Sequence, residues 1–392
     1  MTYSIWHQRR CQDQRLDIAI IGGGISGLSA AYWLQKHAPS KRIAGFERGE
    51  IGSGASGRNA GFMTCGSIAH FDRQRTNLGL ETALELWSMT AENHHLLAAE
   101  GLLHSACDYA KTGAFSLTRA PERVESLREA ADLLRTHGAK VHHVSAGDAP
   151  LPDFAGGYWY EGDAQLDPIR LLEVLREASN VSWHQGTNVR AIRPTEDGVA
   201  VETDGGTYQA TTVIVATNAY APEWLPELGP WVRPVRAQAL VTAPASRPLR
   251  APVYALDDWA YLRQDVQGRI ILGGFRPLAA DEEVGTEDLL HPRVHAALDA
   301  FLARHCGDLF DEAPRVLRRW SGALGYAPDA LPIVGELPDH PGCFFIGAHS
   351  GHGMGWAFVA AERLVALMLH GARPGPLDAR RLPGRVRSPT PR

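Results

Sequence analysis

Three glycines near the start of the chain have the spacing of a dinucleotide-binding turn. Gly22, Gly24 and Gly27 form a GxGxxG motif directly after the apolar run DIAII, and an alanine-rich helical pattern follows them. Gly22 permits a tight turn, Gly24 lets the backbone approach a pyrophosphate, and Gly27 lets the helix pack closely on the strand. The helix N-terminus would offer free N–H groups to the phosphates. Glu47, 20 positions after Gly27, can accept hydrogen bonds from ribose hydroxyls. The motif predicts a dinucleotide, although it does not separate FAD from NAD.

A second glycine-rich segment covers residues 52–62, with the sequence GSGASGRNAGF. Small residues between its glycines let the backbone approach a ligand without obstruction. Arg58 can pair with a phosphate or a flavin carbonyl, and Asn59 can donate and accept hydrogen bonds at a ring edge. The alternative interpretation is a flexible surface loop.

Three segments together resemble the D-amino-acid oxidase superfamily of FAD enzymes. They are DIAIIGGGISGLSAAYWL, FERGEIGSGASGRNAGF and IGAHSGHGMGWAFVAAERL. The GASGRNAG loop and the SGHG turn are most similar to gamma-glutamylputrescine oxidases and their glycine and sarcosine oxidase relatives. The resemblance extends from Asp17 to about Gly371, and its two ends carry the specific motifs. It implies an α/β (α+β) fold, in which a Rossmann-like FAD-binding domain carries an inserted antiparallel-sheet substrate domain.

The resemblance also implies which residues hold the cofactor and line the substrate site. In the family the SGHG turn lies beside the flavin, and the following helix N-terminus stabilises negative charge on the reduced ring. The alternative for His352 is a structural histidine bonded to backbone. The expected catalytic residues are His352, Arg58, Arg236 and Tyr261. The expected cofactor-binding residues are Gly22, Gly24, Ile25, Ser26, Gly27, Glu47, Arg48, Gly54, Ala55, Ser56, Arg58, Asn59, Ala60, Gly61, Val189, Ala216, Thr217, Gly347, Ser350, Gly351, His352, Gly353 and Met354.

The chain departs from its relatives in three places. Covalent-flavin members carry a cysteine before a Pro-Asp pair, but WSGALGYAPD between Trp320 and Asp329 has none, so a non-covalent FAD is expected. The stretch RIILGGF lacks the lysine that those members use for oxygen activation, which puts efficient use of oxygen in doubt. The arginine that binds the carboxylate in glycine oxidases, just after the GH turn, is also missing from HGMGWAF.

The segment between Pro230 and Arg276 is expected to shape the substrate pocket. An arginine could bind a substrate carboxylate with both nitrogens of its fork, and aromatic rings could flank an amine. For each residue separately, the alternative is an ordinary surface or core side chain. The candidate wall residues are Arg236, Tyr254, Trp259, Tyr261 and Arg276.

Hydrophobic periodicity orders these motifs along the chain. Residues 17–47 form a β-α-β pattern, and helices are expected at 81–104, 120–137, 166–178 and 287–305. The last of the strands between 181 and 219 is fully apolar at its end, as a buried strand is. Residues 1–16 are expected to be an arm on the first unit. The predicted FAD-binding domain comprises 1–105, 145–228 and 320–371, the substrate domain 106–144 and 229–319, and a flexible tail 372–392.

Composition is that of an ordinary globular protein. The 392 residues are 44% apolar, and the net charge of −5 argues against nucleic acid as the main partner. Five scattered cysteines without metal-ligand spacing favour a reducing cytoplasm, and no secretion signal or metal motif is visible. Glycine clusters interrupt the two uncharged stretches, 18–35 and 342–361, so no membrane span is predicted.

These observations predict FAD-dependent oxidation of an amine or amino acid by hydride transfer to flavin N5, giving an imine that hydrolyses. The substrate must enter with a neutral amine, because a protonated amine has no lone pair to drive hydride departure. Electrons would then pass to oxygen or to another acceptor. The rivals are an FAD-dependent hydroxy-acid dehydrogenase, another acceptor-linked dehydrogenase, and a flavin-binding protein without turnover. The sequence does not decide the substrate or the oligomeric state.

Overall fold

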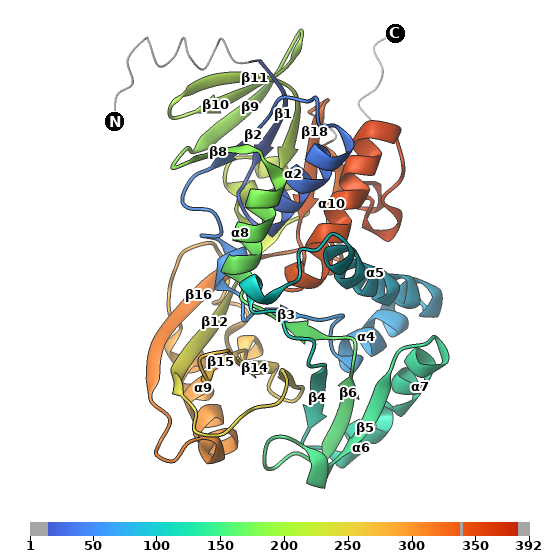
Figure 1. The fold of residues 1–392 in the computed structure, drawn as a ribbon, viewed down its shortest axis with the longest axis vertical. Helices are drawn as coiled ribbons and strands as arrows, with labels where there is room; N and C mark the ends of the chain where they lie inside the picture. Colours follow the sequence, from blue (N-terminus) through green and yellow to red (C-terminus); the bar gives the residue numbers. More distant parts are fainter. Residues whose placement is uncertain (1–14, 338–339, 383–392) are drawn as a thin grey trace.

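A computed structural model describes residues 15–337 and 340–382, and its two large sheets lie at opposite ends of the molecule (Figure 1). In the first sheet, β18 (Cys343–Gly347), β11 (Gly206–Val215), β1 (Arg15–Ile21), β2 (Ile43–Glu47) and β8 (Ser182–Gln185) are neighbours in that order, and all run parallel. β17 (Ile333–Glu336) adds an antiparallel edge strand to β18. β9 (Val189–Thr195) and β10 (Gly198–Thr203) extend β11 as an antiparallel hairpin.

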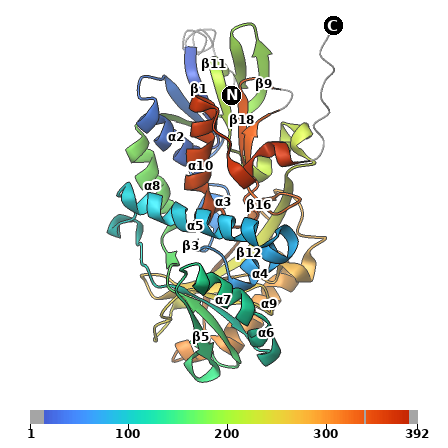
Figure 2. The same ribbon diagram turned by 90° about the vertical axis from the view of Figure 1, so that its right-hand side faces the viewer.

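Four helices share one apolar core with the first sheet. They are α2 (Ile25–His37), α5 (Leu80–Ala99), α8 (Pro168–Ser179) and α10 (Gly353–His370). As predicted, Asp167 starts α8: its carboxylate accepts hydrogen bonds from the N–H groups of Ile169 and Arg170, with Pro168 in the first turn. Figure 2 shows α5 lying across the molecule between the two sheets.

The second sheet has the strand order β16 (Val316–Tyr326), β12 (Arg233–Pro244), β15 (Arg269–Gly273), β14 (Ala260–Gln264), β13 (Val253–Ala255), β4 (Ala114–Thr118), β6 (Gly156–Tyr160) and β5 (Val141–Ser145). Its neighbours are antiparallel except β13 and β4, which run parallel. The predicted antiparallel sheet is therefore mixed at one point, because the strands that meet there come from distant segments of the chain. α9 (Pro292–His305) contributes to the apolar core of this sheet.

Smaller elements connect the two sheets. α3 (Ala55–Arg58) lies within the second glycine-rich segment, and α4 (Ile68–Leu78) follows it. β3 (Phe62–Met63), between them in the chain, pairs with β7 (Ala164–Gln165), which precedes α8. α6 (Pro121–Ser126) and α7 (Arg128–Thr136) occupy the region predicted as one helix at 120–137. α4 and α7 share a core with β5 and β6, so α4 is held against the second sheet.

Strand pairing shifts two of the predicted boundaries. β6 lies inside the predicted FAD-binding segment 145–228, yet it pairs with β4 and β5 of the second sheet. The predicted segment 320–371 likewise begins inside β16, which pairs with β12 of the second sheet over most of its length. Periodicity identifies a strand but not its partners, so these two boundaries were wrong; the division of the chain into domains otherwise stays a prediction.

The described part of the predicted tail is packed against the protein. Leu377, Ala379 and Leu382 are buried, and the Arg381 guanidinium binds the Asp329 carboxylate at 2.7 Å. The prediction of a flexible tail is therefore wrong for residues 372–382, because three apolar side chains among the prolines and arginines reach the core. Residues 383–392 and most of the predicted N-terminal arm lie outside the described residues. No helix within 15–337 and 340–382 has the length and apolarity needed to cross a membrane.

Candidate active site

A cavity of about 880 Å³ connects the first sheet to the second. It begins at the turn between β1 and α2 and at the end of β2, and it reaches residues of β12, β14 and β16. Its volume is at the upper end of the range for small-molecule and cofactor sites, about 300–1,000 Å³. One space therefore joins the predicted dinucleotide turn to the predicted substrate residues.

The glycines at the first end are required by close packing. A Cβ at Gly22 would lie 2.7 Å from the Ala216 carbonyl oxygen, and one at Gly27 would overlap the Gly22 carbonyl oxygen. A Cβ at Gly24 would lie 2.9 Å from Ser56 Oγ, which accepts a hydrogen bond from the Ile25 N–H. These contacts hold the start of α2 against β1 and leave its N-terminus facing the cavity.

Glu47 lies at the end of β2, beside this turn. Its carboxylate accepts hydrogen bonds from the Gly23 N–H and the Gly49 N–H, both at 2.8 Å. Val189, at the start of β9, lines the same part of the cavity. The carboxylate is thus oriented by backbone at the position where the motif expects a ribose.

The second glycine-rich segment forms the next part of the wall. The Arg58 guanidinium donates to Asp288 at 2.7 Å, to the Ser321 carbonyl at 2.9 Å and to the Ser53 carbonyl at 2.9 Å. Asn59 donates to the Ser56 carbonyl and accepts from the Gly61 N–H, each at 2.7 Å. Both side chains hold the segment in one conformation, which argues against the alternative of a flexible surface loop.

Aromatic and imidazole side chains surround the opposite end. The rings of His70 and His352 are in contact, with centroids 4.3 Å apart, and burial lowers the pKa of both. Burial raises the pKa of Tyr261 to about 12 and also raises those of Tyr254 and Tyr326. At neutral pH these five side chains are therefore uncharged.

Arginines supply the positive charge at this end. Arg276 lies over the Tyr326 ring at 4.7 Å, and Arg73 lies over the Trp259 ring at 5.0 Å. Neither arginine has a carboxylate within ion-pair distance among the described residues. This end of the cavity combines cationic groups with neutral hydrogen-bonding groups, which suits an anionic ligand.

Comparison with known proteins identifies the family. The family model of FAD-dependent oxidoreductases (DAO) matches residues 17–367. The chain belongs to this family. It is 26% identical to glycine oxidase of Geobacillus kaustophilus over 87% of this chain and 89% of that protein, and 26% identical to gamma-glutamylputrescine oxidoreductase of Escherichia coli over 91% and 84%. The crystal structure of the Geobacillus kaustophilus glycine oxidase superposes with a TM-score of 0.79 at 25% identity, covering 94% of this chain and all of that one. The predicted superfamily, mixed α/β fold, FAD cofactor and oxidoreductase activity are confirmed.

The walls of the first half of the cavity fit the cofactor of this oxidoreductase. The Thr217 hydroxyl is buried there without a hydrogen-bond partner among the described residues. The helical N-terminus of α10, with His352 at its cap and Gly353 behind it, also opens on the cavity. A dinucleotide would supply partners for both groups.

Most of the predicted site residues line the cavity, and one catalytic candidate does not. Arg236 faces away, because alternate residues of β12, Ala237 and Ala239, face the cavity instead. Its guanidinium donates to Glu283 at 3.0 Å and to Glu287 at 2.9 Å, so the prediction of Arg236 as a pocket residue is wrong. Gly27, Gly61 and Gly347 do not line the cavity either. The predicted residues that do line it are Gly22, Gly24, Ile25, Ser26, Glu47, Arg48, Gly54, Ala55, Ser56, Arg58, Asn59, Ala60, Val189, Ala216, Thr217, Ser350, Gly351, His352, Gly353, Met354, Tyr254, Trp259, Tyr261 and Arg276.

Sequence reasoning missed three residues of the substrate end. His70 and Arg73 come from α4, a helix that the periodicity analysis did not assign, and Tyr326 ends β16. A local signal for α4 was present, since Ser67 caps it by accepting a hydrogen bond from the His70 N–H. Nothing local indicates that its side chains face Tyr326.

Proposed function

We propose that this FAD-dependent oxidoreductase oxidises the C–N bond of an amino acid whose carboxylate binds Arg276. The observation that carries the proposal is the Arg276 guanidinium. It lines the same cavity as the dinucleotide turn, lies over the Tyr326 ring and has no carboxylate partner among the described residues. A planar guanidinium can bind a carboxylate with two parallel hydrogen bonds. Relatives named glycine oxidase and D-amino acid dehydrogenase support the substrate class.

The surrounding side chains suit an uncharged amine. Bound FAD supplies the acceptor for the two electrons and the hydride that leave the substrate carbon. The arginines create a positive potential that lowers the pKa of the substrate amine, so its lone pair is free at a less basic pH. His352, His70 and Tyr261 stay neutral and can accept or donate hydrogen bonds without opposing that potential. We assign these residues to positioning the substrate, and assign proton removal to solvent.

The proposal extends to the state of the cofactor and the acceptor. None of the described cysteines lines the cavity, which supports a non-covalent flavin. None of the described lysines lines it either, which supports slow reaction of the reduced enzyme with oxygen and another electron acceptor. The proposed location is the cytoplasm, supported by the free, buried thiols of Cys65, Cys107, Cys306 and Cys343.

The test compares each amino acid with the amine that lacks its carboxylate. Replacing Arg276 by Met should lower kcat/KM for the amino acid about 30-fold or more, because removing one partner of a buried charge pair costs about 2–5 kcal/mol. For the amine that lacks the carboxylate, the same substitution should lower kcat/KM much less. Arg318→Met is the matched control, because Arg318 is exposed on β16 and does not line the cavity. Equal losses for amino acid and amine would contradict the assignment of Arg276, and product ammonia distinguishes amino-acid from hydroxy-acid oxidation.

A further inference from the structure

Six arginines line the cavity, and they differ in whether a carboxylate neutralises them. Arg48 pairs with Glu223 at 3.1 Å, Arg58 with Asp288 at 2.7 Å, and Arg123 with Asp257 at 2.9 Å. Arg190 stands on β9, next to Val189 at the dinucleotide end. The remaining two, Arg73 and Arg276, both lie at the substrate end. One amino-acid carboxylate accounts for Arg276 and leaves Arg73 without a counter-charge.

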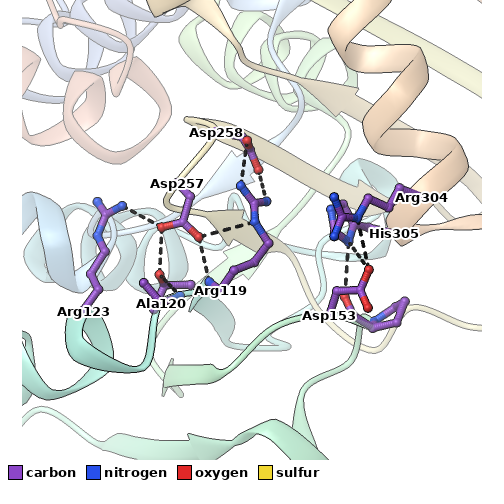
Figure 3. Close-up of polar contacts among 10 residues, drawn as sticks. Arg119, Ala120, Arg123, Asp153, Asp257, Asp258, Arg304 and His305 are labelled. Carbon is purple, nitrogen blue, oxygen red and sulfur yellow. Dashed lines mark hydrogen bonds and ion pairs between the residues drawn. The ribbon is translucent and has the colours of Figure 1, made fainter.

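Figure 3 shows the carboxylates that neutralise Arg123 and the neighbouring Arg119. Asp257 accepts hydrogen bonds from the Thr118 hydroxyl at 2.7 Å and the Arg119 N–H at 2.7 Å, as well as from Arg123. The next residue, Asp258, binds the Arg119 guanidinium through both carboxylate oxygens. Both carboxylates of this turn between β13 and β14 are therefore occupied.

The same contacts fix the position of Trp259, which follows Asp258. Trp259 has a left-handed backbone, with φ of 50°, and its side chain is 48% exposed. An exposed tryptophan in such a conformation is costly by itself, and the paired aspartates before it hold the turn in place. The Arg73 guanidinium carbon lies over the Trp259 ring, 5.0 Å from the ring centre. No carboxylate of the described residues lies within ion-pair distance of Arg73, so its N–H groups can bind an oxyanion.

Arg73 and Arg276 both act on the same phenol. Both are close enough to Tyr326 to favour its ionised form, which opposes the effect of burial on its pKa. The Tyr326 hydroxyl lies beside Gly351 of the SGHG turn, since a Cβ on that glycine would be 3.2 Å from it. A ligand at Tyr326 would thus have the Arg276 guanidinium, from the turn after β15, and the Arg73 guanidinium of α4 within reach.

We propose that the substrate is an acidic amino acid, whose second carboxylate or equivalent oxyanion binds Arg73 while its α-carboxylate binds Arg276. This inference rests on the proposed function. The second oxyanion of the substrate would bind the Arg73 guanidinium, which lies over the Trp259 ring at the cavity wall. The Arg73 residue is exposed, so solvent also reaches this position. Neutral amino acids of the same length would lack a partner for Arg73, so the enzyme should prefer the acidic ones.

The first experiment measures binding without turnover. Thermal melting of the FAD-loaded enzyme is followed with glutarate and succinate, and with valerate and butyrate as monocarboxylates of matched length. The dicarboxylates should bind at least tenfold more tightly than the monocarboxylates. In Arg73→Gln that preference should fall to less than threefold, whereas Arg75→Gln, which changes the same helix outside the cavity lining, should keep it. Equal binding of the two series by the wild type would overturn the proposal.

The second experiment measures selectivity in turnover. The ratio of kcat/KM for aspartate and glutamate over that for alanine and 2-aminobutyrate should fall at least tenfold in Arg73→Gln, and Arg73→Lys should restore part of it. An unchanged ratio would overturn the role of Arg73 while leaving amino-acid oxidation intact. If no amino acid reduces the flavin, the proposed function fails, and the dicarboxylate measurement still decides whether Arg73 binds an anion.

Discussion

The two halves of the cavity differ in how their arginines are paired. In the dinucleotide half, Glu47 accepts two backbone hydrogen bonds, and Arg48 and Arg58 are paired with Glu223 and Asp288. In the substrate half, Arg73 and Arg276 have aromatic contacts and no carboxylate partner among the described residues. Arg48 and Arg58 therefore obtain their counter-charge from the protein itself. Arg73 and Arg276 would obtain theirs from a ligand.

This difference also explains where specificity lies. The first half is built from backbone and close glycine contacts, which fit any FAD regardless of the reaction. The second half is built from side chains of α4, β14, β16 and the turn that follows β15, which bring two cations toward Tyr326. Cofactor binding should therefore depend on backbone shape, and substrate choice should depend on charge.

The largest expected effect is at the backbone of the dinucleotide half. Gly27→Ala places a Cβ against the Gly22 carbonyl oxygen, so α2 must move away from β1 and the phosphate site is lost. We expect the purified variant to contain less than about a tenth of the wild-type FAD, from its absorbance ratio, and to melt at a lower temperature. Gly307→Ala is the control, because its Cβ would meet nothing within 4 Å. Full FAD occupancy in Gly27→Ala would contradict the packing argument.

A smaller effect is expected at His349, whose side chain contacts α2 and whose backbone pairs with Tyr326 of β16. Its Nε2 lies 2.7 Å from Ser26 Oγ of α2, and burial lowers the pKa of His349 to about 4. An unfolded histidine has a pKa of about 6.5, so it becomes protonated below that pH while the folded His349 stays neutral until about pH 4. The free energy of unfolding therefore falls as the pH decreases from about 6.5 to about 4. The full contribution is roughly 3 kcal/mol, since one pKa unit corresponds to about 1.4 kcal/mol.

The measurement is the urea unfolding free energy of wild type and His349→Gln between pH 7.5 and 4.5. Glutamine does not titrate and can keep a hydrogen bond to Ser26, so the variant should lose less stability on acidification than the wild type. Because other buried histidines titrate in both proteins, the difference between the two curves isolates His349. Parallel curves would mean that folding does not lower the pKa of His349.

The sequence predicted the dinucleotide half of the cavity better than the substrate half. The turn at Gly22–Gly27, Glu47 and the loop with Arg58 are each short local motifs, so spacing was enough to predict that they lie together at one cavity. Arg236 was assigned to the wrong face of β12, because an arginine in a strand carries no sign of which sheet face it occupies. Arg73 and Tyr326 were missed, since they are about 250 positions apart and only the folded chain brings them together.

The fold shows the same limit. The parallel β-α-β unit and the start of α8 were predicted from local patterns, whereas the pairing of β6 and β16 with the second sheet was not. The buried residues of 372–382 were also missed, because Leu377 and Leu382 stand among prolines and arginines and have no periodic apolar neighbours. Local spacing predicts helices and strands. The partners of a strand and the burial of a terminal segment depend on distant parts of the chain.

The most direct test of the account is an anaerobic titration of the purified, FAD-containing protein, followed by absorbance. The panel holds amino acids, the amines that lack their carboxylates, and hydroxy acids of the same size. The account predicts that amino acids bleach the flavin, that the matching amines and hydroxy acids do so at least tenfold less efficiently, and that colour returns slowly in air. Bleaching by amines alone, or a protein that neither contains nor takes up FAD, would contradict it.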